Sequence, residues 1–163
     1  MARKRPIPAD LKREEVLALD IAEHTGFYST HGGGTWTFTE SKSRNDNKKH
    51  KHFRDTLIKF IEKNNIRFVT AEDILMNKMR FRATVSLSEL RGILYEVCDT
   101  MNLPEPEFIN ATTIKSFATG KGNASKEEMV EACIKKYNIT PVDDNHADAA
   151  FIFNYFCRRF KVR

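Results

Sequence analysis

Two short apolar segments of this chain each end in a carboxylate, and this pattern constrains the fold more than any other feature. Residues 16–19 (VLAL) precede Asp20, and residues 68–71 (FVTA) precede Glu72. Short apolar runs bounded by polar residues are typical of buried strands. A third carboxylate, Asp148, lies within a segment of small residues. Carboxylates are costly at the edge of a core, so a shared cation explains the three better than packing does, and Mg²⁺ prefers such oxygens.

Length and composition predict one domain with a real core, since the chain has 163 residues, of which 40% are hydrophobic. We expect residues 1–13 to form a loose basic N-terminal arm and residues 14–163 to form the domain. No run of about 18 apolar residues occurs, so no membrane span is expected. The cysteines lack a CxxC spacing, which indicates buried, reduced thiols in a cytoplasmic protein. They are Cys98, Cys133 and Cys157.

The hydrophobic pattern predicts three strands, a helix, a strand, a helix, a strand and two helices. The expected strands are residues 16–21, 27–29, 35–38, 68–71 and 108–109, with a glycine turn at 32–34 and a mobile loop at 41–50. The expected helices are residues 47–63, one that opens at the capping box Ser86–Glu89, one that opens at the capping box Ser125–Glu128, and residues 145–160. An antiparallel meander followed by crossover units makes an α/β fold, a mixed five-stranded sheet flanked by helices.

Basic residues gather in one stretch of the chain, which has a net charge of +5. Such a surface suits a polyanion, because neutralised phosphates release counterions, although any single lysine could belong to a solvated helix face. Residues 79–82 (MRFR) interleave apolar and cationic side chains, which could stack on unpaired bases or belong to the core. The predicted DNA-binding residues are Lys48, Lys49, Lys51, Arg54, Arg80, Phe81, Arg82 and Lys121.

The three carboxylates converge if the first and fourth strands are neighbours, because Asp20 and Glu72 then lie side by side. The start of the last helix could bring Asp148 to them. Asp144 is four residues before Asp148 and Asn145 is three before it, so either shares its helix face. His146 is two residues away and would point elsewhere. Asp143 or Asp144 could instead cap this helix.

Several segments together resemble the RuvC-type Holliday junction resolvases. The first half matches at residues 17–21 (LALDI), 25–27 (TGF) and 71–72 (AE). The second half matches at residues 114–115 (IK), 119–129 (TGKGNASKEEM) and 144–149 (DNHADA). The resemblance covers residues 16–157 and is most specific in the second half.

The resemblance implies a ribonuclease H-like fold, a homodimer and magnesium-dependent cutting of branched DNA. It assigns metal binding to Asp20, Glu72 and Asp148. The fourth ligand of the family falls on Asn145, a poorer ligand, for which Asp144 or His146 could substitute. Lys115 and Lys126 match the basic catalytic residues. We expect two Mg²⁺ ions, for which Mn²⁺ could substitute, with Asp20 between them.

The function that follows is a crossover junction endodeoxyribonuclease, a phosphodiester hydrolase in the cytoplasm of a bacterium or encoded by a phage. Two alternatives stay open: a non-cleaving branched-DNA-binding module of the same fold, and a related nuclease that acts on RNA–DNA hybrids. A helical stripe could form a dimer interface or pack on the sheet. Its members are Leu90, Leu94, Val97 and Met101. Glu23 is expected to be a solvated loop residue.

Overall fold

The computed structural model describes residues 5–38, 46–74 and 81–163. Within these ranges the strands are β1 Val16–Asp20, β2 His24–Ser29, β3 Gly32–Thr37, β4 Phe68–Glu72 and β5 Glu107–Ile109. The helices are a short 3-10 turn at Arg13–Glu15, α1 Asp46–Asn64, α2 Phe81–Thr100, α3 Ala111–Thr119, α4 Lys126–Tyr137 and α5 Asp144–Arg159. In the described residues no helix is long and apolar enough to cross a membrane.

The strands form one five-stranded mixed sheet in the order β3-β2-β1-β4-β5. The β1–β2 and β2–β3 pairs are antiparallel, whereas β1–β4 and β4–β5 are parallel. The predicted meander and crossovers, and the α/β class, are therefore confirmed. The predicted neighbourhood of the first and fourth strands is also confirmed, because β1 lies in the middle of the sheet and pairs with β4.

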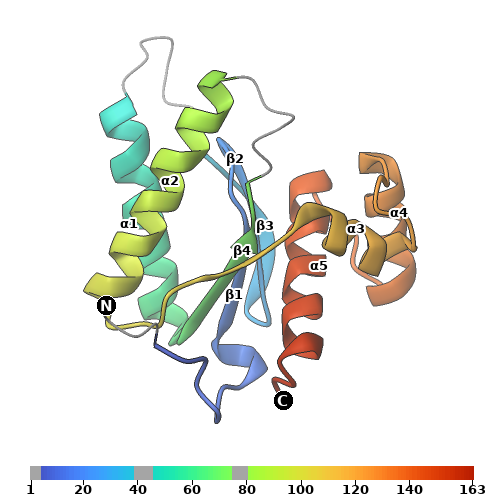
Figure 1. The fold of residues 1–163 in the computed structure, drawn as a ribbon, viewed down its shortest axis with the longest axis horizontal. Coiled ribbons are helices and arrows are strands. Elements are labelled where there is room, and N and C mark those ends of the chain that lie inside the picture. The colour runs from blue at the N-terminus through green and yellow to red at the C-terminus, as the bar shows by residue number, and fades with distance from the viewer. Residues whose placement is uncertain (1–4, 39–45, 75–80) are drawn as a thin grey trace.

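Helices cover both faces of the sheet (Figure 1): α1 and α2 lie on one face and α5 lies on the other, with α3 and α4 beyond it. Because side chains alternate along a strand, β1 supplies both cores. Val16 and Ala18 belong to the cluster on the α5 side, whereas Leu17 and Leu19 belong to the cluster under α1 and α2. All four are fully buried, which explains their continuous apolar run.

Four local expectations need correction. The hairpin turn lies at residues 30–31, and Gly32–Gly34 belong to β3. His146 and Tyr28 leave no room for a side chain at Gly33, which explains a glycine within this strand. Helix α2 begins at Phe81, five residues before the capping box predicted at Ser86. Residues 46–50, expected in a mobile loop, form the first turns of α1, and residues 41–45 lie outside the described residues.

The fourth correction is α3, a helix that the sequence pattern did not predict. Asn110 caps it by accepting a hydrogen bond from the Thr112 amide at 2.8 Å. Gly120 ends it with a φ of +80°, a left-handed conformation that glycine adopts without steric cost. The nine residues between them are too few to show a clear apolar stripe.

Residues 1–13 were expected to form a loose arm. The described part of this segment, residues 5–13, lies against the domain. Leu11 is only 5% exposed and packs in the α5-side cluster. The Arg13 amide donates to the Arg163 carbonyl at 2.9 Å, and Arg5 donates to the Asn102 side chain at 2.6 Å. An apolar side chain at position 11 explains this, because burying a leucine is worth about 2 kcal/mol.

Candidate active site

Asp20 and Glu72 are brought together by the register of two parallel strands. Leu19 pairs with Ala71, so Asp20 and Glu72 are the next residues of adjacent strands. Asp20 follows Val16 and Ala18 at the strand period of two, and Glu72 follows Phe68 in the same way. Since Val16, Ala18 and Phe68 pack on the α5 side, both carboxylates point toward the same face.

The first turn of α5 supplies the other acidic residues. Asp143 is the N-cap, and its carboxylate accepts hydrogen bonds from the His146 amide at 2.9 Å and the Thr35 hydroxyl at 2.6 Å. Hydrogen bonds from Thr35 and the neighbouring groups hold the pKa of Asp143 below its ordinary value, although burial opposes them. The capping role therefore belongs to Asp143, which leaves Asp144 in the first turn to face the site.

Two glycines let α5 approach the sheet closely enough for its carboxylates to reach the strands. A side chain at Gly26 would place its Cβ 1.9 Å from the Asn145 carbonyl oxygen. A Cβ at Gly33 would lie 2.5 Å from Nε2 of His146. Both separations are far below van der Waals contact, so this helix position requires glycine at both places.

His146 packs against the sheet and does not point toward the carboxylates. Its side chain is 6% exposed, and its Nδ1 accepts a hydrogen bond from the Val142 amide at 3.2 Å. Burial holds the pKa of His146 below its ordinary value, which favours the neutral ring. The expectation that His146 points away from Asp148 is confirmed.

The acidic side chains line one cavity of about 280 Å³, which we call the carboxylate cavity. It lies at the ends of β1 and β4, where α5 begins. Its acidic and amide lining residues are Asp20, Glu72, Asp73, Asp144, Asn145 and Asp148. The sequence prediction that Asp20, Glu72 and Asp148 share one pocket therefore agrees with the geometry.

Burial and mutual repulsion make these carboxylates weak acids. Burial raises the pKa of Asp20 well above its ordinary value, and the charges of Glu72 and Asp148 raise it further. Burial raises the pKa of Glu72 to about 7, against the charge of Lys115. The pKa of Asp148 also rises to about 7, first through burial and then through Glu72 and Asp144. Such perturbed groups in a cavity mark a functional site.

The residues of the carboxylate cavity fit hard divalent cations. Oδ1 of Asp148 is buried and accepts no hydrogen bond, and a cation would satisfy it. The donor set of carboxylate oxygens is the one that Mg²⁺ prefers. Within the described ranges no three acidic, histidine or cysteine side chains lie close enough together to hold one ion as they stand. Asp144, for example, is turned toward Lys126.

Both predicted catalytic lysines lie close enough to this cavity for their charges to affect its carboxylates. Nζ of Lys126 lies 2.9 Å from Oδ2 of Asp144, and this hydrogen bond raises the pKa of Lys126. The Lys126 side chain is 78% exposed, so it lies at the mouth of the cavity. Lys115, on α3, lowers the pKa values of Glu72 and Asp148 through its charge, although burial outweighs it.

Arg91 of α2, which the sequence pattern did not single out, also lines the carboxylate cavity. Its guanidinium donates a short hydrogen bond to Asp73 and lies 3.7 Å from the centre of the Phe108 ring. Asp73 directly follows Glu72, so this ion pair anchors the end of β4 to α2. The position of Arg91 between Leu90 and Leu94, close to the apolar face of α2, is the sequence signal that could have marked it as a site residue.

The predicted DNA-binding residues lie in different places. Lys49, Phe81 and Arg82 line a second cavity beside the first. Lys51 pairs with Asp55, Arg54 with Glu96 and Lys121 with Glu128 on outer surfaces. Lys48 is exposed in the first turn of α1, and Arg80 lies outside the described residues.

The helical stripe on α2 packs under the sheet. Leu90, Leu94 and Val97 are fully buried in the cluster beneath α1 and α2, and Met101 packs against it. Packing therefore accounts for the stripe. Glu23 is exposed in the β1–β2 turn, as expected, and it also lines the second cavity.

No protein-family model and no curated protein sequence matches this chain. Solved structures do match. A Thermus thermophilus RuvC in complex with a Holliday junction substrate superimposes with a TM-score of 0.70 at 14% identity, over 90% of this chain and 95% of that one. A second T. thermophilus RuvC structure gives 0.70 at 15% identity, over 90% and 96%.

The yeast mitochondrial Holliday junction resolvase superimposes with a TM-score of 0.64 at 16% identity, over 96% of this chain and 81% of that one. The likeness extends over nearly the whole chain in each case. The chain therefore has the ribonuclease H-like fold of the RuvC type, which confirms the fold that the sequence resemblance implied.

Proposed function

We propose that this chain, whose fold is that of the RuvC-type resolvases, is a metal-dependent and structure-selective endodeoxyribonuclease that cleaves Holliday junctions or other branched DNA. The observation that carries the proposal is the gathering of four carboxylates around one cavity of this fold, in addition to Asp73, which pairs with Arg91. They come from β1, β4 and α5 and are Asp20, Glu72, Asp144 and Asp148. Packing alone would not favour four acidic groups in one cavity.

The carboxylate cavity would hold two divalent ions, Mg²⁺ or Mn²⁺. Asp20 lies beside Glu72 on the sheet, and Asp148 of α5 is near enough to raise the pKa of Asp20, so these three carboxylates would hold the ions. We assign the fourth ligand to Asp144, because a charged carboxylate binds a hard divalent cation more strongly than the neutral amide of Asn145 does. When bound, such ions activate a water molecule and stabilise the departing 3′-oxygen of a phosphodiester.

The lysines would bind and orient the phosphate. Lys126 is held over the cavity by Asp144, and its exposed ammonium can contact a phosphate oxygen there. Lys115 approaches from α3 on the side of Glu72 and Asp148. Two cations from separate helices would position the phosphate and neutralise the charge that develops during hydrolysis.

A four-way junction has two strands to cut, and two carboxylate cavities related by symmetry would match them. We therefore expect a homodimer on branched DNA, as the RuvC resemblance implies. Closed two-fold dimers are the commonest soluble oligomers. The predicted cytoplasmic origin in a bacterium or phage belongs to the same proposal.

A cleavage panel tests the proposal: four-way junctions, flaps, forks, RNA–DNA hybrids and linear duplex, each with and without Mg²⁺. We expect cutting of branched DNA only with the ion. Asp20→Asn should abolish cleavage while junction binding persists, whereas the matched surface variant Asp99→Asn should cut like the wild type. Asp99 is exposed at the end of α2.

The same panel separates the alternatives. Binding without cleavage at any Mg²⁺ or Mn²⁺ concentration would identify a non-cleaving module, and preferential cutting of hybrids would identify a ribonuclease. Wild-type cleavage rates in Asp20→Asn would refute the assignment of the carboxylate cavity.

A further inference from the structure

The residue that follows Glu72 is held from the face of the sheet opposite to α5. Glu72 points toward α5, whereas the next residue, Asp73, pairs with Arg91 of α2, which covers the other face (Figure 1). Oδ1 of Asp73 accepts hydrogen bonds from the Arg91 guanidinium and from the Ile74 amide, the latter at 2.9 Å. The Asp73 amide donates to the Ile109 carbonyl of β5 at 2.8 Å. Asp73 is therefore held by α2, by β5 and by the residue after it.

Arg91 is itself fixed, so it can serve as an anchor. Its guanidinium lies 3.7 Å from the centre of the Phe108 ring and 6.0 Å from the centre of the Tyr95 ring. Phe108 belongs to β5, where it pairs with Ala71 of β4. A surface ion pair alone restrains a chain weakly, but a guanidinium that also stacks on an aromatic ring is held in one plane. Arg91 therefore joins the ends of β4 and β5 to α2.

The consequence of this anchor falls on Glu72. Glu72 directly precedes Asp73 and pairs with Ile109 of β5, so its backbone is held together with the anchored residue. Groups that hold a metal ligand in place change metal affinity by about ten- to a hundredfold when they are removed. Loss of Arg91 should therefore reach the ion site although Arg91 is not a ligand.

Charge alone would give Arg91 the opposite effect. A cation that lines the carboxylate cavity repels divalent ions, so its removal should strengthen their binding. Removal of an anchor that places Glu72 should instead weaken their binding. A residue that serves only the stability of the fold should change neither. The sign of the change in ion affinity therefore separates the three roles.

We infer that Arg91 is a positioning residue for the ion site: it fixes Glu72 through Asp73, and it engages the Asp73 carboxylate so that this group does not bind the ions. The inference rests on the proposed function, because it requires divalent ions at Glu72. Two consecutive carboxylates at the end of β4 then have separate tasks. Glu72 binds an ion, and Asp73 holds the end of the strand.

Binding of Mn²⁺ to the protein without DNA tests the inference apart from cleavage, because electron paramagnetic resonance measures free Mn²⁺ directly. Arg91→Gln should weaken Mn²⁺ binding about tenfold. Arg67→Gln is the matched control, because Arg67 directly precedes the other end of β4 and pairs there with Asp10 and Glu15; it should leave Mn²⁺ binding unchanged. Equal or tighter binding by Arg91→Gln than by the wild type would overturn the inference, and so would equal losses in the two variants.

A double-mutant cycle tests whether Arg91 acts through Asp73. Asp73→Asn should weaken Mn²⁺ binding about as much as Arg91→Gln does, and the double variant should bind no more weakly than either single variant. Losses that multiply in the double variant would refute the path through Asp73.

A conservative variant tests the contribution of the ion pair. Arg91→Lys keeps the charge that pairs with Asp73 but loses the planar stack on Phe108, so its Mn²⁺ affinity should lie between those of the wild type and Arg91→Gln. An affinity equal to that of Arg91→Gln would contradict the role of the ion pair. Thermal unfolding of each variant checks that the protein is folded at the temperature of the titration.

The two proposals can fail separately. If the wild type binds Mn²⁺ and cuts junctions while Arg91→Gln binds Mn²⁺ equally well, only the role of Arg91 is wrong. If Mn²⁺ binding depends on Arg91 and Asp73 but no branched DNA is cut, the nuclease activity is wrong and the role of Arg91 stands. A wild type that binds no Mn²⁺, with or without junction DNA, would overturn both.

Discussion

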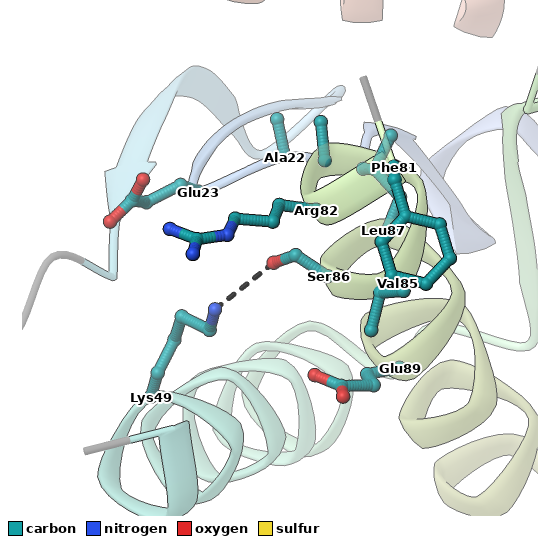
Figure 2. A pocket seen from close by; sticks show the side chains of 10 residues that line it. Ala22, Glu23, Lys49, Phe81, Arg82, Val85, Ser86, Leu87 and Glu89 are labelled. Atoms are coloured by element: carbon teal, nitrogen blue, oxygen red, sulfur yellow. Dashed lines mark hydrogen bonds between the residues drawn. The ribbon is translucent and has the colours of Figure 1, made fainter. Parts of the chain in front are cut away.

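The two adjoining cavities differ in how their polar groups are satisfied. In the carboxylate cavity the acidic groups are half-buried, repel one another and leave Oδ1 of Asp148 without a partner. In the second cavity, which Lys49, Phe81 and Arg82 line (Figure 2), Lys49 donates to Ser86 and Glu89 pairs with His50, while Phe81 is exposed to water. The first arrangement is costly without a compensating ion. The second is stable without a ligand.

The difference indicates a division of labour. Buried groups of one sign suit small ions of the opposite charge, which supply chemistry. Basic side chains beside an exposed aromatic ring are instead typical of surfaces that contact nucleic acid. Variants that damage one cavity should therefore leave the function of the other intact.

Gly26→Ala should give the largest effect. The added methyl group would overlap the Asn145 carbonyl, so α5 must move away from the sheet and carry Asp144 and Asp148 with it. We expect a loss of about 3 kcal/mol in the free energy of unfolding, measured by denaturant titration, and cleavage reduced at least about a hundredfold.

Gly92→Ala is the control for this change. Gly92 lies in α2 with open space where a Cβ would be, so alanine should stabilise the protein by about 0.5–1 kcal/mol. Unchanged stability and cleavage in Gly26→Ala would mean that α5 does not need this close contact.

Asp144→Asn should give the next largest effect. If Asp144 binds the metal as we propose, its loss should raise the Mg²⁺ concentration for half-maximal cleavage by about ten- to a hundredfold, measured by Mg²⁺ titration on a junction. Asn145→Ala should shift it much less, because a neutral amide is a weaker ligand for a hard divalent cation than a carboxylate is. The reverse ranking would assign the fourth ligand to Asn145.

The dependence of stability on pH should give the smallest effect. Without divalent ions the carboxyl pKa values in the folded state lie above the ordinary values, about 7 against 4.5 for Glu72 and about 7 against 3.8 for Asp148. The folded protein then binds more protons than the unfolded chain between these values, so stability is highest at low pH within this window and is lost as pH rises through about 7.

We expect unfolding free energies to fall by on the order of 2 kcal/mol from pH 5 to pH 8 in EDTA. Asp148→Asn should flatten this dependence, and Mg²⁺ should stabilise the wild type more at pH 8 than at pH 5. Asp55→Asn, at an exposed site on α1, should leave the profile unchanged. A rise of stability from pH 5 to pH 8 in EDTA would contradict the buried carboxylates.

Much of this site could be predicted from sequence because local rules set it. The alternation along β1 and β4 fixes which residues share a face, and so it places Asp20 and Glu72 together once the two strands pair. The capping box at Ser125 begins α4 where predicted, because cap hydrogen bonds involve residues only three apart. Helix α3 had readable caps at Asn110 and Gly120, but its short apolar pattern did not indicate a helix.

Other features depend on segments far apart in the chain. Either Asp143 or Asp144 could have capped α5 by sequence alone, and the choice is made by Thr35 on β3, which donates to Asp143. Arg91 lines the carboxylate cavity only because α2 lies beside the end of β4. Ser86 matched a cap but lies inside α2, where it accepts a hydrogen bond from Lys49 of another helix.

The sequence by itself determined the order of the five strands, the faces of β1 and β4 and the identity of the acidic residues, because periodicity and caps act over a few residues. Only the tertiary structure decided how closely α5 approaches the sheet at Gly26, which aspartate faces the site, and that a second cavity adjoins it. Those depend on the packing of whole elements against one another, which no local pattern encodes.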